Sequence, residues 1–190
     1  MDRKAAEKVM VAKGNQYDIR DVAKEAGLGY GTVYHYYSNK EILLREVMEA
    51  GLAIAAEVTG QIFASHESPV QQLESYCNAL LQTWMLHTSV YLVYKAASEN
   101  YCNLDEMFRQ QLSVQFQHEL YKPLAECVER AMEAKEIGVQ LKAESLSNGL
   151  LGSLIGSYGI YLYHQEMPPD PSIITELLLR GLREGKGDNR

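Results

Sequence analysis

The 190-residue chain is predicted to be all-α, with a small N-terminal three-helix domain joined to a larger helical domain. Apolar residues recur at three- and four-residue spacing over long stretches, whereas the alternation typical of strands is scarce. Only five prolines occur, and three of them are clustered between Pro168 and Pro171. Hydrophobic residues make up 46% of the chain and charged residues 23%, a globular balance that excludes a disordered or fibrous protein.

Four helices are expected between residues 4 and 64, because helix start and stop signals divide this stretch. Gly14 ends the first apolar stripe, and Asp18 can cap the helix that follows. Ser38 or Asn39 can cap the fourth helix, whose roughly 25 residues would extend about 37 Å and could join two domains. The expected helices cover residues 4–13, 18–25, 30–36 and 40–64, with a turn at 27–29.

The larger domain begins within the fourth helix and continues beyond a break between His66 and Pro69. Helical patterns resume after this break, and the tail after Gly185 is expected to be loose. The expected helices cover residues 70–87, 89–99, 104–135, 143–164 and 172–183. The domains are therefore predicted to cover residues 1–48 and 49–185, followed by a flexible tail at 186–190.

The formal charge of −7 is unevenly distributed along the chain. Residues 1–50 hold eight basic and eight acidic residues, whereas the remainder holds ten basic and seventeen acidic residues. A negative field repels phosphate, so the acidic body argues against nonspecific binding of polyanions. The neutral first quarter leaves one end of the molecule where phosphate is tolerated.

Cysteine usage and the N-terminus indicate the cellular compartment. The three cysteines, Cys77, Cys102 and Cys127, are far apart and form no CxxC pair, so a disulfide framework is not expected. The first residues, MDRKAAEKVMVAKG, lack the apolar segment of a secretory signal. We therefore expect a cytoplasmic protein.

Residues 19–40 have the order of small, apolar and turn residues that two sharply crossing helices require. A small residue stands where the helices would approach, and a glycine supplies the turn. A leucine is expected to fill the corner, and apolar residues point inward from both helices. In order, these residues are Val22, Ala23, Ala26, Gly27, Leu28, Val33 and either Tyr36 or Tyr37. The pattern predicts a helix-turn-helix.

The second helix of this helix-turn-helix and the residues after it carry hydroxyl, imidazole and ammonium groups on their outward face. No acidic residue occurs between Glu25 and Glu41. Such groups donate hydrogen bonds to phosphate oxygens, and tyrosine can contact base edges or thymine methyls. The pattern favours a DNA-binding surface; the alternative is a structural helix pair with surface tyrosines. The outward candidates are Tyr30, Gly31, Thr32, Tyr34, His35 and Lys40.

The run AGLGYGTVYHYYSNKEILL resembles the signature of the tetracycline-repressor (TetR) family of bacterial transcriptional regulators. The preceding segments IRDVAKEAG and AEKVMVAKG are similar to the family's earlier helices. This motif resemblance covers about the first 50 residues, and beyond them only length and helical architecture are similar. The resemblance implies DNA contacts by Arg20, Tyr30, Gly31, Thr32, Tyr34, His35 and Lys40.

Three features depart from the family pattern. Few residues precede the first helix, so the usual N-terminal arm is absent or trimmed. Met10 stands where an aromatic residue is usual. The loop after Gly14 is slightly short, and Asp18 and Ile19 replace a frequent Thr/Ser pair, so a phosphate-binding hydroxyl is lost there. These departures bear on affinity and on the choice of operator.

Residues 146–163 form an uncharged run that is diluted by too much glycine, serine and tyrosine for a membrane span. Its small residues allow another backbone to approach closely, and the final helix has a broad apolar face. Two such helices per chain could form a four-helix bundle in a homodimer, as the resemblance also implies; the alternative is internal packing of a monomer. A dimer would place two recognition helices about 34–36 Å apart, matching successive major grooves. The expected interface residues are Gly149, Gly152, Ser153, Gly156, Leu177 and Leu178.

The middle helices are rich in aromatic residues and methionine. An apolar cavity with a few polar groups is typical of a small-molecule site, although aromatic residues at helical spacing can equally form an ordinary core. Because the TetR resemblance implies an enclosed inducer cavity here, ligand contacts are expected from Trp84, His87, Tyr94, Phe116 and Tyr158.

Signals of catalysis are weak. The five histidines form no HExxH motif, and neither a phosphate loop nor a nucleophile elbow is present. We expect no catalytic residues, no metal and no cofactor. The sequence is interpreted as a homodimeric repressor that a small apolar or aromatic effector releases from double-stranded operator DNA. The main alternative is a helical ligand-binding or protein-interaction module without specific DNA binding, and an enzyme is a third possibility.

Overall fold

The computed structural model describes residues 3–99, 101, 104–138, 141–164 and 170–184. Within these ranges every regular element is helical and no strand is present, so the prediction of an all-α fold is confirmed. The helices are α1 (Arg3–Lys13), α2 (Ile19–Glu25), α3 (Tyr30–Tyr36), α4 (Lys40–Phe63), α5 (Pro69–Leu86), α6 (Thr88–Ser98), α7 (Glu106–Phe116), α8 (Lys122–Glu133), α9 (Ala143–His164) and α10 (Pro171–Glu184), with a 3₁₀ turn η1 (Gly14–Gln16) and a π-helical turn η2 (Gln117–Tyr121).

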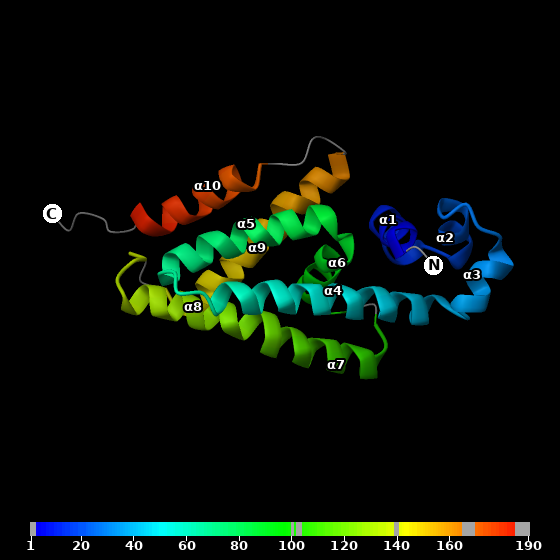
Figure 1. Cartoon of the computed structure of the whole chain (residues 1–190), viewed down its shortest axis with the longest axis horizontal. Coiled ribbons are helices and arrows are strands. Elements are labelled where there is room, and N and C mark those ends of the chain that lie inside the picture. The colour runs from blue at the N-terminus through cyan, green and yellow to red at the C-terminus, as the bar shows by residue number, and fades with distance from the viewer. Residues whose placement is uncertain (1–2, 100, 102–103, 139–140, 165–169, 185–190) are drawn as a thin grey trace.

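The molecule is elongated, with α1, α2 and α3 at one end and the remaining helices forming a larger body (Figure 1). Helix α4 runs lengthwise between the two parts and packs against α1 near the small end and against α5, α6 and α8 in the body. Buried apolar side chains form one cluster that continues from α1 to α10. The predicted boundary between residues 48 and 49 falls inside α4, so a continuous helix would join the two proposed domains.

Helix α4 begins at a capping residue, and Gly51 within it serves packing. The side chain of Asn39, rather than Ser38, accepts a hydrogen bond from the Ile42 amide at 2.9 Å. Gly51 lies where α4 crosses α6, and a Cβ atom there would overlap the backbone of Ser89. The glycine therefore allows close contact between these helices rather than ending the helix.

The helix expected over residues 104–135 is observed as a helical run from Glu106 to Glu133, but it contains a π-helical turn that the sequence pattern did not predict. Helices α7 and α8 are joined by the π-helical turn, in which the amide of Lys122 donates to the carbonyl of Gln117. Pro123 follows this turn and cannot donate a hydrogen bond to an earlier turn of helix. The wider turn also adjusts the register of the buried side chains on the two helices.

Other sequence-based expectations concern the membrane, the cysteines and the chain end. In the described ranges, no helix has the length and apolar character needed to cross a membrane. Cys77 and Cys127 are buried free thiols, and burial raises the pKa of each, to about 12 for Cys77 and about 11 for Cys127. Cys102 and the predicted tail at 186–190 lie outside the described residues.

Candidate nucleic-acid interface

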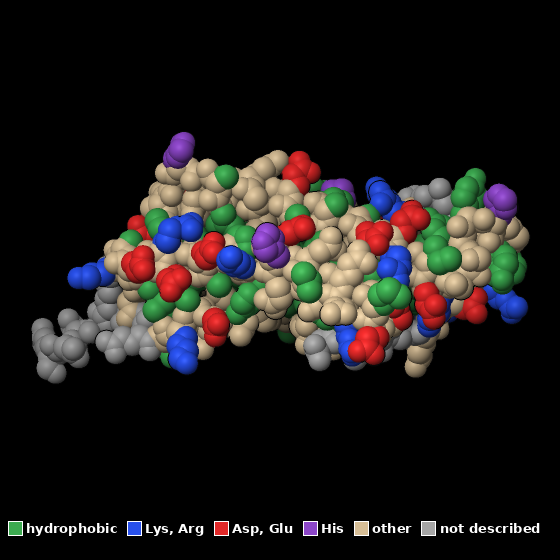
Figure 2. Space-filling view, turned by 90° about the horizontal axis from the view of Figure 1, so that it is seen from below, with side chains coloured by type: hydrophobic (Ala, Val, Ile, Leu, Met, Phe, Trp, Pro, Cys, Tyr) green, Lys and Arg blue, Asp and Glu red, His purple; other side chains and the backbone are tan. Residues whose placement is uncertain are grey.

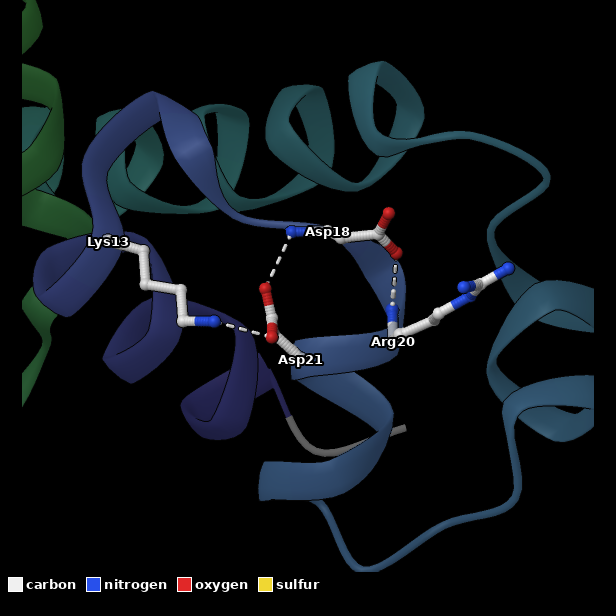
Figure 3. A network of polar contacts seen from close by, with 4 residues as sticks. All are labelled: Lys13, Asp18, Arg20 and Asp21. Carbon is white, nitrogen blue, oxygen red and sulfur yellow. Dashed lines mark hydrogen bonds and ion pairs between the residues drawn. The ribbon is translucent and has the colours of Figure 1, made fainter.

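The start of α2 is fixed by a capping box, in which the carboxylates of Asp18 and Asp21 each accept a hydrogen bond from a backbone amide (Figure 3). The Asp18 side chain accepts a hydrogen bond from the Arg20 amide at 2.8 Å, and the Asp18 amide donates to Asp21 Oδ2 at 2.9 Å. Lys13 Nζ, from the end of α1, donates to the other Asp21 oxygen. This hydrogen bond and that from the Asp18 amide lower the pKa of Asp21. The predicted cap at Asp18 is confirmed and also ties α2 to α1.

The end of α2 has the hydrogen bonds of a Schellman motif. The Leu28 amide donates to the carbonyl of Ala23 at 2.9 Å, and the Gly27 amide donates to the carbonyl of Lys24 at 3.2 Å. Gly27 has φ +65°, which a residue with a side chain adopts only at a cost. The side chain of Leu28 is 41% exposed, so the expectation that it fills the corner is wrong: its amide, not its side chain, contributes to the turn.

Helix α3 is held by one buried valine and by the tyrosine that follows its last turn. Val33 is fully buried and Tyr37 is 4% exposed, whereas Tyr36 is 61% exposed. Tyr37, rather than Tyr36, is therefore the second anchor. Its hydroxyl donates to Glu46 of α4 at 3.1 Å, and burial together with this carboxylate raises the pKa of Tyr37.

A second tyrosine fixes the start of α4 against the turn between α1 and α2. The hydroxyl of Tyr17 donates to the carbonyl of Lys40 at 3.0 Å, and the ammonium of Lys40 lies 5.3 Å from the Tyr17 ring centre. Burial, with the nearby Glu41 carboxylate, raises the pKa of Tyr17 to about 12. The position of Lys40 is therefore coupled to the packing of the three-helix unit.

All seven residues predicted to contact DNA are exposed on α2, α3 and the start of α4. The rings of Tyr30 and Tyr34 lie 5.5 Å apart, and the Arg20 guanidinium lies 5.5 Å from the Tyr30 ring centre. Figure 3 shows the Arg20 side chain extending away from Asp18 and Asp21. The residues are Arg20, Tyr30, Gly31, Thr32, Tyr34, His35 and Lys40.

The molecular surface differs in character between the two ends. At the tip formed by α2 and α3, side chains coloured as hydrophobic, which include tyrosine, reach the surface beside a histidine and basic groups (Figure 2). Acidic and basic side chains are mixed along the rest of the visible face. The tip combines hydrogen-bond donors and flat rings with little negative charge, which suits a duplex surface.

Residues 3–47 match the family model described as "Bacterial regulatory proteins, tetR family". The N-terminal part of the chain therefore carries the DNA-binding domain of this family. With this domain the protein is a DNA-binding transcriptional regulator, and its helix-turn-helix lies within the matched residues. Regulators of the family act as dimers. The comparison with curated protein sequences gives no match.

Solved structures share the fold of this regulator over nearly the whole chain. They include the MbdR regulator from Azoarcus sp. CIB, at TM-score 0.79 and 14% identity, covering 96% of this chain and 95% of that one. AibR in complex with isovaleryl coenzyme A and operator DNA has TM-score 0.76 and 16% identity, covering 95% of each chain. FadR from Bacillus subtilis in complex with stearoyl-CoA has TM-score 0.68 and 16% identity, covering 96% of each chain.

Four of the five predicted ligand residues meet in one aromatic cluster in the body. The Trp84 ring centre lies 5.3 Å from that of Tyr94 and 5.5 Å from that of Tyr158. The Phe116 ring centre lies 5.3 Å from that of Tyr94. His87 is exposed at the junction of α5 and α6, outside this cluster. Of the five residues predicted together as ligand contacts, the four aromatic ones therefore lie together and His87 does not.

A cavity of about 400 Å³ lies beside this cluster, between α6, η2, α7 and α9. Of the predicted ligand residues, Tyr94 and Phe116 line it, whereas Trp84 and Tyr158 do not. Sequence reasoning missed Tyr101, Gln117 and Asn148. A signal was available only for the helical part of this lining, because Tyr94, Ala97 and Ser98 follow the three- and four-residue spacing of one helix face, whereas Tyr101 lies beyond the end of α6. The described lining residues are Tyr94, Ala97, Ser98, Tyr101, Ser113, Phe116, Gln117, Tyr121, Asn148, Leu151, Gly152 and Ile155.

The predicted dimer residues lie on surfaces that are accessible in the single chain. The four small residues of α9, Gly149, Gly152, Ser153 and Gly156, are exposed, and Ile160 extends their stripe with 64% exposure. On α10, Leu177 is 74% exposed and Leu178 is partly buried. Large apolar side chains at such exposure are consistent with a surface that a partner covers.

Proposed function

We propose that this protein is a homodimeric, cytoplasmic repressor without enzymatic activity, which an uncharged effector releases from operator DNA. The proposal rests above all on the exposed tyrosine-rich face of α3, held in place by the caps of α2 and the anchor at Tyr37. The cytoplasm is where a regulator has access to bacterial DNA.

We assign DNA contacts according to the chemistry of each exposed group. Arg20 and Lys40 carry positive charge toward phosphate, and Thr32 provides a hydroxyl donor. Tyr30 and Tyr34 present rings and hydroxyls that can reach base edges or thymine methyls. Neutralisation of DNA phosphates by cationic side chains dominates the affinity of a protein for DNA. Because each helix-turn-helix offers few cationic side chains, one copy alone would bind DNA weakly. Two copies on one duplex are therefore part of the proposed mechanism.

The dimer would form through α9 and α10. Apart from the backbone of its own helix, a Cβ atom at Gly156 would meet no described atom of the same chain within 4 Å, so Gly156→Leu is expected to leave the fold of one chain intact. In the dimer the same side chain would stand between the two copies of α9, and we expect at least tenfold weaker dimerisation in sedimentation equilibrium. Gly60→Leu is the matched control, because Gly60 is equally open but lies on α4. Equal dimerisation of both variants would contradict this interface.

The proposed effector site is the 400 Å³ cavity, a volume typical of small-molecule sites. Its lining combines aromatic rings with hydroxyl and amide groups, and none of the described lining residues is charged. AibR and FadR share the fold, and their structures contain acyl-coenzyme A ligands. The phosphates of such a ligand need cationic partners that this lining lacks, so we propose an uncharged aromatic or apolar effector.

A physical route connects this cavity to the recognition helix. Phe116 lines the cavity at the end of α7, and Phe108 lies two turns earlier on the same helix. The Arg45 guanidinium of α4 lies 4.2 Å from the Phe108 ring centre and pairs with Asp105 at 3.3 Å. A shift of α7 on effector binding would therefore act on α4 close to its start. A coupling of about 1–3 kcal/mol would suffice to reduce operator affinity.

The test of this function is operator binding by the full chain. Sites are selected from random duplexes, and binding is measured by fluorescence anisotropy at two salt concentrations. We expect specific binding that weakens as salt rises. Tyr34→Ala should weaken it by about 10- to 100-fold with the fold and dimer intact, whereas Met107→Ala, an exposed control on α7, should not change it. Absence of binding at low salt would instead favour a ligand-binding or protein-interaction module.

A further inference from the structure

A second cavity of about 160 Å³ lies where the three-helix unit meets the body. Its walls come from α1 and the following turn, from α4, and from α6 and the segment after it. Figure 1 shows α1 beside α6, and α1 also packs against α4. A molecule in this cavity would touch the DNA-binding unit, the connecting helix and the body at once.

Helix α6 separates this cavity from the proposed effector cavity. Leu92, Lys95, Ala96 and Glu99 line the cavity at α1, at the spacing of one helix face. Tyr94, Ala97 and Ser98, on another face, line the effector cavity. The neighbouring residues Ala96 and Ala97 therefore belong to different cavities.

Tyr101 lines both cavities and forms a shared wall. The residue is 6% exposed, and its amide donates to the carbonyl of Ala96 at 2.8 Å. Its backbone has φ +52°, a conformation that is uncommon for a residue with a side chain. Such conformations persist where the surrounding structure holds them, and they are enriched at ligand sites and switch regions.

The lining of the small cavity defines the ligand that it would take. Met10, Met48 and Leu104 provide apolar surface. Tyr17 contributes a ring whose hydroxyl donates a hydrogen bond to the carbonyl of Lys40. Among the described lining residues, the charged groups are Lys95 and Glu99, which lie 3.9 Å apart and neutralise each other. An apolar cavity of about 150 Å³ in another protein accommodates benzene. The size and charge therefore fit a compact, uncharged molecule with a single aromatic ring.

We propose that the cavity between α1, α4 and α6 is a second ligand site, which takes a compact uncharged aromatic molecule and sets the orientation of the DNA-binding unit, with Tyr101 linking it to the effector cavity. Its effect on DNA rests on the proposed function, but ligand binding itself does not. The two ideas can therefore fail separately.

Binding is tested with phenol as the probe on the full-length protein carrying ¹³C-methyl methionine. We expect saturable shifts of the Met10 and Met48 methyl resonances, because both side chains line the cavity. Met107, which is 78% exposed on α7, serves as the control and should not shift. Unmoved Met10 and Met48 resonances, or equal shifts at Met107, would overturn the site.

Matched substitutions on α6 distinguish the two cavities. Ala96→Leu adds a side chain to the small cavity, and Ala97→Leu adds the same side chain to the effector cavity. With phenol in calorimetry, we expect at least tenfold weaker binding at the α1 site in Ala96→Leu and retained binding in Ala97→Leu. Equal binding by both variants would overturn the assignment. The methionine shifts of the unsubstituted chain decide the question if Ala96→Leu does not fold.

The regulatory part is tested by operator affinity. Saturating phenol should change the operator affinity of Ala97→Leu at least threefold. Without phenol, the operator affinity of Ala96→Leu should differ from that of the unsubstituted chain in the same direction, because the new leucine side chain itself occupies the small cavity. Phenol binding at Met10 and Met48 without any change in operator affinity would refute the link to DNA. A chain that binds phenol there but no DNA at all would instead refute the proposed function.

Discussion

The helix-turn-helix and the helical body are specified by contacts of different range. In the helix-turn-helix, the cap of α2 joins Asp18 to residues two and three positions later, and the following turn joins Leu28 to Ala23. In the body, the hydroxyl of Tyr158 donates to the carbonyl of Trp84, 74 residues earlier, at 2.9 Å. The first region is therefore determined largely by local sequence, and the second by which distant segments meet. Substitutions can test this contrast.

The largest effect is expected from Trp84→Ala in the body. The Trp84 side chain is fully buried and packs against three tyrosine rings, so its removal should lower the free energy of unfolding by about 3–5 kcal/mol. Urea denaturation measures this loss. Tyr34→Ala is the matched control from the helix-turn-helix, and its exposed side chain should change stability by less than about 0.5 kcal/mol. Similar losses for both variants would contradict the contrast.

The next largest effect is expected at the crossing of α4 and α6. Gly51→Ala places a methyl group against the backbone of Ser89 and should cost about 1–3 kcal/mol through forced separation of the helices. Gly60→Ala, on the same helix with open space around it, should instead be neutral or stabilising by up to about 1 kcal/mol. Thermal unfolding compares the two variants. If Gly60→Ala were also destabilised, the loss in Gly51→Ala could not be assigned to the contact with Ser89.

A smaller effect is expected from loss of the local cap. Asp18→Ala removes the acceptor for the Arg20 amide and should cost about 1 kcal/mol. Asp18→Asn keeps an acceptor and should restore most of this stability. Urea denaturation of the three proteins measures the difference. If Asp18→Ala cost as much as Trp84→Ala, the cap would belong to a network wider than its own turn.

The smallest effect is expected in the pH dependence of stability. Because the folded-state pKa of Asp21 lies below its ordinary value of 3.8, ionised Asp21 favours the folded state. This contribution is present above the ordinary value and is lost as the pH falls through the lower folded-state value. Asp21→Asn should therefore flatten part of the decline in melting temperature between about pH 5 and about pH 2. Lys13→Ala should reproduce part of this change, and an unaltered profile in both would contradict the local ion pair.

Sequence reasoning specified the helix-turn-helix almost residue by residue. It identified the cap at Asp18, the turn at Gly27 and the buried position of Val33, because caps, turns and helix faces depend on neighbours in the sequence. It could not choose between Tyr36 and Tyr37, because both follow a short helix and only the position of α4 decides which one is buried. It also misplaced Leu28 for the same reason.

The body was predicted in architecture but only partly in its cavities. Trp84, Tyr94, Phe116 and Tyr158, which were predicted as ligand contacts, lie together, since large aromatic side chains on amphipathic helices meet in a core. Whether a given ring faces a cavity or another ring depends on helix crossings that spacing alone does not define. Tyr101 lies beyond the end of α6, where helical periodicity no longer predicts the direction of a side chain.

The π-helical turn between α7 and α8 has a consequence for comparisons among relatives. Leu112, Phe116, Leu120, Leu124 and Val128 are all buried, at intervals of four residues. In an uninterrupted α-helix such a row drifts around the axis by about 40° at each step, so its two ends would face different directions. The wider turn compensates for part of this drift, as a one-residue insertion would during evolution. An ancestor or homologue without it should align with this segment only across a single-residue gap, and its last helical turns would present a different set of side chains to the interior.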